Sequence, residues 1–264
     1  MPNSMPTTIG SRGWLSVTSA RAIAALIIAL GAVALAPAAA ATTPADLPGA
    51  ANAEQVIIVS STDYRSTRAR LSAYEKLPDG TWAAVARDVP AFVGSRGIVP
   101  GNERRQSTGT TPAGTYAITS AFGRKSNPGT TLPYVQVDAN DAWTYNPRVP
   151  ATYNIFQTAP VSWASYGRYV ERLQSMGRQY NYVAVLDYNL PSGTITTDAR
   201  GIRRTSKPAD TRAGGGIFLH VSKGEPTAGC ISISEGTMQR IMDWLDIAKK
   251  PVIVIGSASQ LDLS

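Results

Sequence analysis

The sequence predicts a mainly β protein with a few helices, whose strands form a sandwich or a barrel. Short runs rich in Val, Ile, Tyr and Thr recur between turn signals along most of the chain, as in proteins built from many short strands. Only two segments show an apolar spacing that favours a helix. About 210 residues after the last linker-like stretch contain no internal repeat, and this length fits one domain.

Eight runs of the sequence carry the predicted strands. They are QVIIVSS at 55–61, RARLSAYEK at 68–76, WAAVARDV at 82–89, GTYAITSAF at 114–122, LPYVQVD at 132–138, YNYVAVLDYN at 180–189, GIFLHV at 216–221 and PVIVIG at 251–256. Between the second and third runs, Pro78, Asp79 and Gly80 predict a hairpin turn in which Gly80 supplies a positive φ.

The first predicted helix covers residues 163–176. Its Trp, Tyr, Leu and Met side chains recur at intervals of three and four, and Gly177 follows as a stop. We interpret this apolar stripe as a face that packs against the core.

The second predicted helix covers residues 238–245, where Met, Ile and Leu recur with the same spacing. Ser232 or Ser234 can cap its N-terminus, and Glu235 would complete a capping box with Ser232. Its apolar stripe is again interpreted as core packing.

The first 41 residues have the layout of a secretory signal peptide. Arg12 and Arg21 precede an apolar run at 22–36, which breaks at Pro37 into four alanines. The alternative is an uncleaved membrane anchor, but the 15 residues of the run are fewer than the roughly 20 that a spanning helix needs. We therefore expect cleavage near Ala41 and a protein that is secreted and associated with the cell wall.

The segment 42–54 is small, polar and contains prolines, which predicts a flexible tether before a domain at 55–264. Without residues 1–41 the chain keeps 23 basic and 18 acidic side chains, a formal charge of +5. Such a charge is attracted to anionic wall polymers or lipid surfaces. Nucleic acid is a poor candidate partner, because the basic residues are scattered and the protein is expected to be exported.

The chain contains one Cys and one His, and this restricts its chemistry. No intrachain disulfide is possible, and two soft ligands are too few for a zinc or iron-sulfur site built from Cys and His. We expect neither a metal nor a cofactor.

The most informative stretch is GGGIFLHVSKGEPTAGCISIS at 214–234, in which His220 lies ten positions before Cys230. A thiol needs a neighbouring base or cation to become a thiolate near neutral pH. A strand ending at His220 and a turn around Gly224 and Pro226 could bring Cys230 back beside the imidazole. The N-terminus of the helix that follows would also favour the thiolate.

Backbone groups around the cysteine are candidate oxyanion donors. Gly229 removes a side chain where a substrate carbonyl would approach, so the N–H groups of Gly229, Cys230 and Ile231 could form an oxyanion hole. The alternative is an inert, buried cysteine and a histidine that only ends a strand. Export favours the functional interpretation, since a secreted protein that keeps one thiol either buries it or uses it.

GIFLH followed by TAGCIS resembles the signature of the L,D-transpeptidase catalytic domain, the YkuD-like family, in which a His and a short loop precede [ST]-x-G-C and an aliphatic residue. Thr227, Gly229, Cys230 and Ile231 match this motif. Other segments that resemble the family are TTPAGTYAITSAFG at 110–123, WTYNPRVPATYN at 143–154 and YNYVAVLDYN at 180–189. The resemblance covers most of residues 55–256 and implies the sandwich or barrel-like fold of that domain.

The sequence departs from the family pattern around the motif. The loop between His and Cys is short, Ala228 precedes Gly229 where His, Arg or Lys is frequent, and Ser232 stands where many members carry Arg. Residues 106–109 read QSTG where an acidic turn often precedes the TP motif. These changes keep the nucleophile and the base and bear on substrate choice and turnover.

The resemblance implies that Cys230 attacks the carbonyl of the third residue of a peptidoglycan tetrapeptide stem, releases the terminal D-Ala and forms a thioester. His220 would take the thiol proton and later deprotonate an incoming amine. An amine from a neighbouring stem would give a crosslink between third residues, and water would give L,D-carboxypeptidase activity. The resemblance also implies covalent inhibition by carbapenems and a backbone carbonyl that orients His220.

Other polar residues are weaker candidates for substrate contacts. Tyr153 and Asn154 could line the substrate groove or pin a loop, and the loop interpretation is slightly favoured. Thr227 could donate a hydrogen bond to substrate or serve as a turn residue. Arg104 and Arg105 could meet a stem-peptide carboxylate, although we expect both to be solvated.

Two other classes of protein are alternatives to the transpeptidase. A papain-like or NlpC/P60-like cysteine peptidase has its Cys before its His, whereas here the only His comes first, which argues against that class. A non-catalytic wall-binding module with the same fold stays open, because Arg is missing after Cys230.

Overall fold

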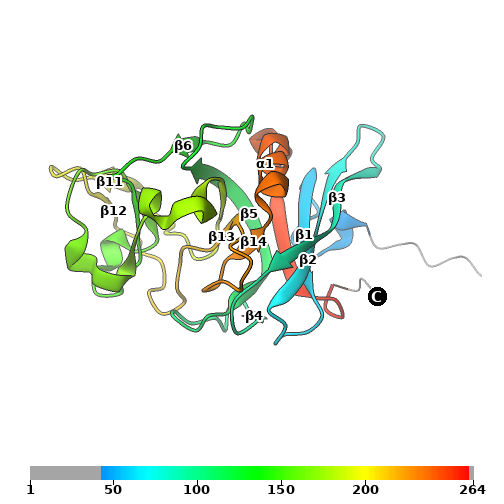
Figure 1. Cartoon of the computed structure of the whole chain (residues 1–264), viewed down its shortest axis with the longest axis horizontal. Coiled ribbons are helices and arrows are strands. Elements are labelled where there is room, and N and C mark those ends of the chain that lie inside the picture. The colour runs from blue at the N-terminus through cyan, green and yellow to red at the C-terminus, as the bar shows by residue number, and fades with distance from the viewer. Residues whose placement is uncertain (1–42, 262–264) are drawn as a thin grey trace, which may run out of the picture. The chain divides into compact units, whose positions relative to one another are not determined.

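A closed sheet dominates the computed structural model, which describes residues 43–261 (Figure 1). Its strands are β1 (Gln55–Ser61), β2 (Arg68–Lys76), β3 (Trp82–Phe92), β5 (Thr111–Gly123), β10 (Val183–Leu186), β13 (Phe218–Val221), β14 (Ile231–Ile233) and β15 (Val252–Ser257). They pair in the order β10-β13-β14-β3-β2-β1-β15-β5, and β5 pairs back with β10. The sheet therefore closes into a barrel, to which β4 (Ile98–Pro100) and β6 (Tyr134–Gln136) are added along β5.

The predicted β class is confirmed, and each of the eight predicted runs overlaps a strand. The predicted hairpin turn also forms between β2 and β3, where the N–H of Gly80 donates to Leu77 O at 2.9 Å and Gly80 has a φ of 85°. Strand β14 was not predicted, because three residues are too few to show alternation.

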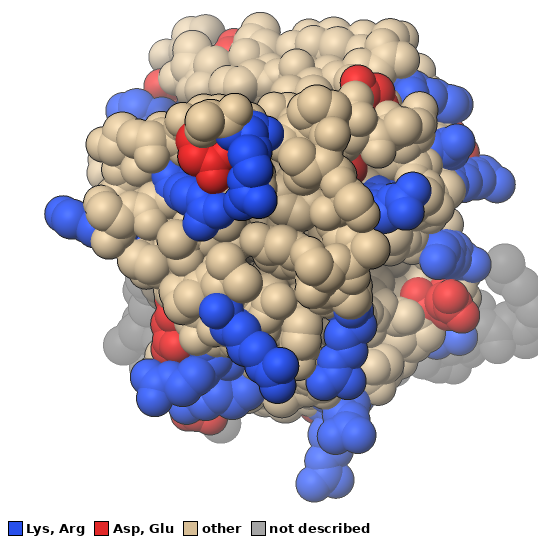
Figure 2. All heavy atoms as spheres, turned by 90° about the vertical axis from the view of Figure 1, so that its left-hand side faces the viewer, with Lys and Arg blue, Asp and Glu red and all other residues tan. Residues whose placement is uncertain are grey.

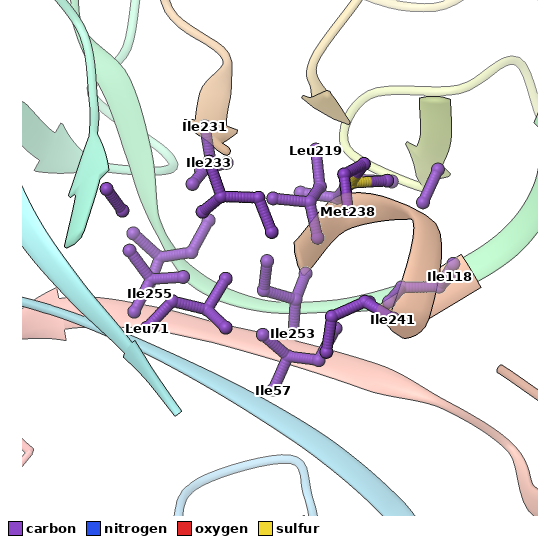
Figure 3. Packing of buried hydrophobic residues seen from close by; sticks show 14 of the residues in the cluster. Ile57, Leu71, Ile118, Leu219, Ile231, Ile233, Met238, Ile241, Ile253 and Ile255 are labelled. Carbon is purple, nitrogen blue, oxygen red and sulfur yellow. The ribbon is translucent and has the colours of Figure 1, made fainter. Parts of the chain in front are cut away.

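The barrel interior is filled by aliphatic side chains that alternate along its strands. Ile57, Leu71 and Leu219 have no exposed surface, and burial of each such side chain contributes roughly 1.5–3 kcal/mol. Helix α1 (Glu235–Trp244) adds Met238 and Ile241 to this cluster, and Figure 3 shows both among the leucines and isoleucines of the strands.

The helix predicted at 238–245 is confirmed as α1, but its predicted capping box does not form. Ser232 is the middle residue of β14, so Ser234 becomes the N-cap. The Glu235 carboxylate accepts hydrogen bonds from Asn181 and Arg178 and pairs with Lys125. These contacts lower the pKa of Glu235 to about 2.

A smaller set of elements covers the outer face of the barrel near β10 and β13 (Figure 1). It comprises a sheet of β7 (Ala142–Thr144), β8 (Ile155–Gln157) and β9 (Val170–Arg172), a pair of β11 (Ile195–Thr197) and β12 (Arg203–Thr205), and the 3-10 helices η2 (Pro150–Thr152), η3 (Ala164–Tyr169) and η4 (Leu173–Tyr180). Aromatic residues of both parts, including Phe122, Trp143, Tyr180 and Phe218, form one buried cluster between them. We refer to this covering part as the lid.

The prediction of a helix over 163–176 is wrong. The segment forms η3, then β9, which pairs with β7, and then η4. Gly167 and Gly177 adopt positive φ angles of 54° and 77°, which interrupts a regular helix. Sheet pairing and the two glycines outweigh the helical spacing of the aromatic residues.

The tether predicted at 42–54 is packed against the barrel over its described part. Residues 44–46 form the 3-10 helix η1 (Pro44–Asp46). Leu47, Ala50 and Ala53, spaced three apart, are buried against Val56 and Val254. The polar composition of the segment conceals these apolar positions. The predicted signal peptide and its cleavage site lie outside the described residues.

A last 3-10 helix, η5 (Ile247–Lys249), connects α1 to β15. On the face of the molecule shown in Figure 2, Lys and Arg side chains form several groups separated by uncharged surface. No helix within residues 43–261 has both the length and the hydropathy of a membrane-crossing segment.

Candidate active site

The side-chain alternation of two parallel strands puts the predicted nucleophile and base on the same face of the barrel. In the β13–β14 pair, Leu219 lies opposite Ile231 and His220 lies opposite Ser232. Leu219 and Ile231 belong to the barrel core. Because successive side chains of a strand point to opposite faces, His220 and Cys230 both point outward, toward the lid, and Cys230 packs against the aromatic cluster there.

The loop between the two strands is held at its far end by the segment that follows strand β3. The N–H of Thr227 donates to Val93 O at 2.9 Å, and the N–H of Ser95 donates to Thr227 O at 2.8 Å. These hydrogen bonds anchor the loop at Thr227, where the chain turns back. Strand β14 can then begin parallel to β13. This is how a connection of only nine residues, 222–230, joins neighbouring parallel strands.

Hydroxyl groups fix the backbone of Cys230. Its carbonyl accepts from Thr227 Oγ1 at 2.6 Å and from Thr111 Oγ1 at 3.2 Å. The N–H of Gly229 donates to Thr227 Oγ1 at 3.0 Å. Thr227 is therefore a turn residue in this structure, and the Gly229 N–H, expected as an oxyanion donor, already has a partner. The two remaining candidate donors, the N–H groups of Cys230 and Ile231, stay a prediction.

The thiol and the imidazole each bond to a backbone carbonyl. Cys230 Sγ donates to Gly216 O at 3.2 Å, and His220 Nδ1 lies 2.9 Å from Val221 O. Since a carbonyl only accepts, this contact puts the proton on Nδ1 and leaves Nε2 as the basic nitrogen. The ring of Tyr180 meets that of His220 edge to face, with centroids 5.7 Å apart.

Burial keeps both groups neutral near pH 7. Desolvation lowers the pKa of His220 to about 4 and raises the pKa of Cys230 to about 12. The negative charge of Glu171 raises the pKa of the thiol further, and Arg104 opposes this. The expectation that a helix N-terminus favours the thiolate is wrong, because α1 begins at Glu235, beyond β14. If this thiol acts as a nucleophile, its proton has to move during the attack rather than before it.

Two cavities meet at Cys230. The first, of about 250 Å³, contains His220, Lys223 and Glu225, and we call it the histidine cavity. The second, of about 180 Å³, contains Arg104 and Arg168, and we call it the arginine cavity. The residues that line both cavities are Glu171, Ala228 and Cys230. The sulfur of Cys230 can therefore be approached from two sides.

Glu171 is a site residue that sequence reasoning missed. Its carboxylate accepts a hydrogen bond from Tyr180 Oη, and burial raises its pKa. The residue lies in β9, within the segment that was predicted to be helical. No local signal marks it, because its proximity to Cys230 depends on the pairing of β9 with β7.

Ser232 also lines the histidine cavity, across the strand pair from His220. Its buried Oγ has no hydrogen-bond partner among residues 43–261. An unsatisfied buried hydroxyl costs free energy, so this group can bond to a molecule that enters the cavity.

Tyr153 and Asn154 are not among the residues that line either cavity. Tyr153 Oη donates to Gln106 Oε1 at 2.9 Å. Asn154, at a φ of 57°, accepts from the N–H of Gly216 at 2.8 Å and donates to Asn189 O at 2.7 Å. Asn154 thus positions the glycine whose carbonyl holds the thiol, which agrees with the loop interpretation.

Arg104 and Arg105 differ sharply in exposure. Arg105 is exposed, as expected. The expectation of a solvated Arg104 is wrong, since it is 4% exposed and its Nη1 donates to Ala213 O at 2.7 Å. The loop before β13 covers Arg104, and no sequence pattern predicts a loop contact of this kind.

The fold and the site define a β-barrel protein with a buried, neutral His220 and a half-buried, neutral Cys230, which lies where two cavities meet. Residues 54–254 match the L,D-transpeptidase catalytic domain (YkuD) family. The chain therefore belongs to this family, as the resemblance implied. A search of curated proteins found no match to the chain.

The lowered pKa of His220 predicts a specific loss of stability in acid. Unfolded His titrates near pH 6.5 and the folded residue near pH 4, so the unfolded state binds the additional proton between these values. Stability should fall by about 3 kcal/mol from this group as pH falls from 7.5 to 4. Urea unfolding of the wild type and of His220→Asn measures it. Equal pH dependence in the two proteins would contradict the shift.

The charge of Glu171 predicts that Glu171→Gln makes the thiol more reactive. Removing a nearby negative charge lowers the pKa of Cys230, so alkylation by iodoacetamide at pH 8–9 should be several-fold faster. Glu225→Gln is the matched control, since Glu225 lines the histidine cavity but is not among the charges that shift the thiol pKa. No acceleration in Glu171→Gln, or the same acceleration in both variants, would contradict the assigned effect.

Proposed function

We propose that this protein is a secreted L,D-transpeptidase that crosslinks third residues of peptidoglycan stem peptides at the cell wall. The observation that carries the proposal is the placement of Cys230 and His220 on one outer face of the barrel, lining one cavity. Membership of the L,D-transpeptidase catalytic domain family supports the reaction class. The export predicted from residues 1–41 supports the location.

The first half of the proposed reaction forms the acyl-enzyme. His220 Nε2 takes the proton of Cys230 Sγ as sulfur bonds to the carbonyl carbon of the third stem residue. The amide bond to the terminal D-Ala then breaks, and the imidazolium gives the proton to the leaving nitrogen. A neutral starting pair suits this sequence, because the proton transfer accompanies the attack and no buried ion pair has to exist beforehand.

The second half transfers the acyl group to an amine of another stem. The amine loses its proton to His220 Nε2 as its nitrogen attacks the thioester carbonyl, and the C–S bond breaks to regenerate the thiol. The two cavities at Cys230 support a reaction with two peptide substrates. Water in place of the amine would make the protein an L,D-carboxypeptidase.

Incubation of the purified protein with a tetrapeptide stem tests the proposal by mass spectrometry. We expect release of D-Ala and a crosslinked product equal in mass to two tetrapeptides minus D-Ala. Cys230→Ala should give no product, and His220→Gln should lower the rate at least about 100-fold. Circular dichroism of both variants checks that the fold is kept.

Two other outcomes would count against the proposal. A tripeptide product without a crosslink would identify the carboxypeptidase. Binding of the stem peptide by wild type without release of D-Ala would favour the non-catalytic wall-binding module.

A further inference from the structure

Arg104 is a buried cation without an acidic partner. It is 4% exposed, and no ion pair with Asp or Glu involves it within residues 43–261. Its hydrogen bonds go to two backbone carbonyls, from Nη1 to Ala213 O at 2.7 Å and from Nε to Thr110 O at 3.4 Å. A buried charge that is not neutralised is costly, so this positive charge calls for an explanation.

Two glycines make the space that the guanidinium occupies. A Cβ atom at Gly214 would lie 1.5 Å from Nη1, and a Cβ atom at Gly229 would lie 3.1 Å from Nη2. Both glycines have positive φ angles, 85° and 147°. The ring of Tyr188 lies on the guanidinium, with its centroid 5.8 Å from the central carbon. The loops before β13 and before β14 are thus shaped around this one side chain.

The guanidinium also borders the arginine cavity beside the reactive sulfur. Arg104, Gly229 and Cys230 line this cavity together. The Nη2 group, next to Gly229, has no hydrogen-bond partner among the described residues. The other charges on the cavity wall are Arg168 and Glu171, and the carboxylate of Glu171 already accepts from Tyr180. The cavity therefore offers an unused cationic donor close to Cys230.

We propose that Arg104 binds the terminal carboxylate of the donor stem peptide in the arginine cavity, an inference that rests on the proposed function. In the donor this carboxylate carbon lies two bonds beyond the scissile amide nitrogen. A donor with its scissile carbonyl at Cys230 Sγ and its leaving group in the arginine cavity brings this carboxylate into the space that Cys230 and Arg104 line together. Arg is suited to this task, because its planar N–H groups match a carboxylate.

The assignment also gives each cavity one substrate. The leaving D-Ala occupies the arginine cavity, and the histidine cavity receives the acceptor amine that His220 has to deprotonate. Glu225 lies beside Lys223 on the wall of the histidine cavity, and Glu171 lines both cavities, so the side assigned to the amine rests on the position of His220.

Two donor peptides that differ only at their end test the inference. One ends in free D-Ala and the other in D-alaninamide, and kcat/KM for release of the terminal residue is measured for both. We expect wild type to prefer the carboxylate by about 10- to 100-fold, as for a charged hydrogen bond worth about 1.5–3 kcal/mol. Arg104→Gln should lose the preference mainly through KM, and Arg104→Lys should keep part of it. Arg105→Gln, the exposed neighbour, should keep all of it.

A preference that persists in Arg104→Gln, or is absent from wild type, would overturn the inference. The preference is a ratio within each protein, so partial destabilisation of a variant does not change it.

Calorimetric binding of both peptides to Cys230→Ala and to Cys230→Ala/Arg104→Gln separates this inference from the proposed function. Tighter binding of the carboxylate peptide that depends on Arg104, with no release of D-Ala by wild type, would keep the anion site and overturn the transpeptidase. Turnover by wild type without Arg104-dependent discrimination would overturn the anion site alone.

Discussion

The parallel pairing of β13 with β14 is the constraint on which the site depends. Inward side chains of both strands, such as Leu219 and Ile231, are held in the barrel core, and a shift of register by one residue would bury polar groups there. The same register sends His220 and Cys230 outward. The barrel core therefore does more than stabilise the fold, because it fixes which residues face the lid and the two cavities.

Burial under the lid determines the chemistry of the pair. Desolvation pushes the pKa values of His220 and Cys230 apart in the direction that leaves both neutral. The thiol is therefore protonated in the resting protein, and the proposed reaction needs the histidine to accept its proton during the attack. Glu171 and Arg104 act on the thiol with opposite signs. The local charge balance around the sulfur is set by two residues that come from distant parts of the chain.

The sequence predicted those features that depend on local patterns. Strands such as β1 and β2 match their predicted bounds because one continuous apolar run and one regular alternation mark them. The order and spacing of His220 and Cys230 indicated the family motif. The helix expected at 163–176 failed because pairing of β9 with β7 is a nonlocal interaction. The burial of Arg104 and the position of Glu171 also depend on distant segments, so no periodic pattern in the sequence predicts them.

The proposed reaction requires that Cys230 be an acylatable nucleophile in a pocket that accepts a peptide-like carbonyl. The most direct measurement is the intact mass of the protein after incubation with a carbapenem, a class of β-lactam to which the family is sensitive in general, beside the same measurement on Cys230→Ala. We expect one covalent adduct on the wild type and none on the variant. No adduct on the wild type, or an equal adduct on both proteins, would contradict it.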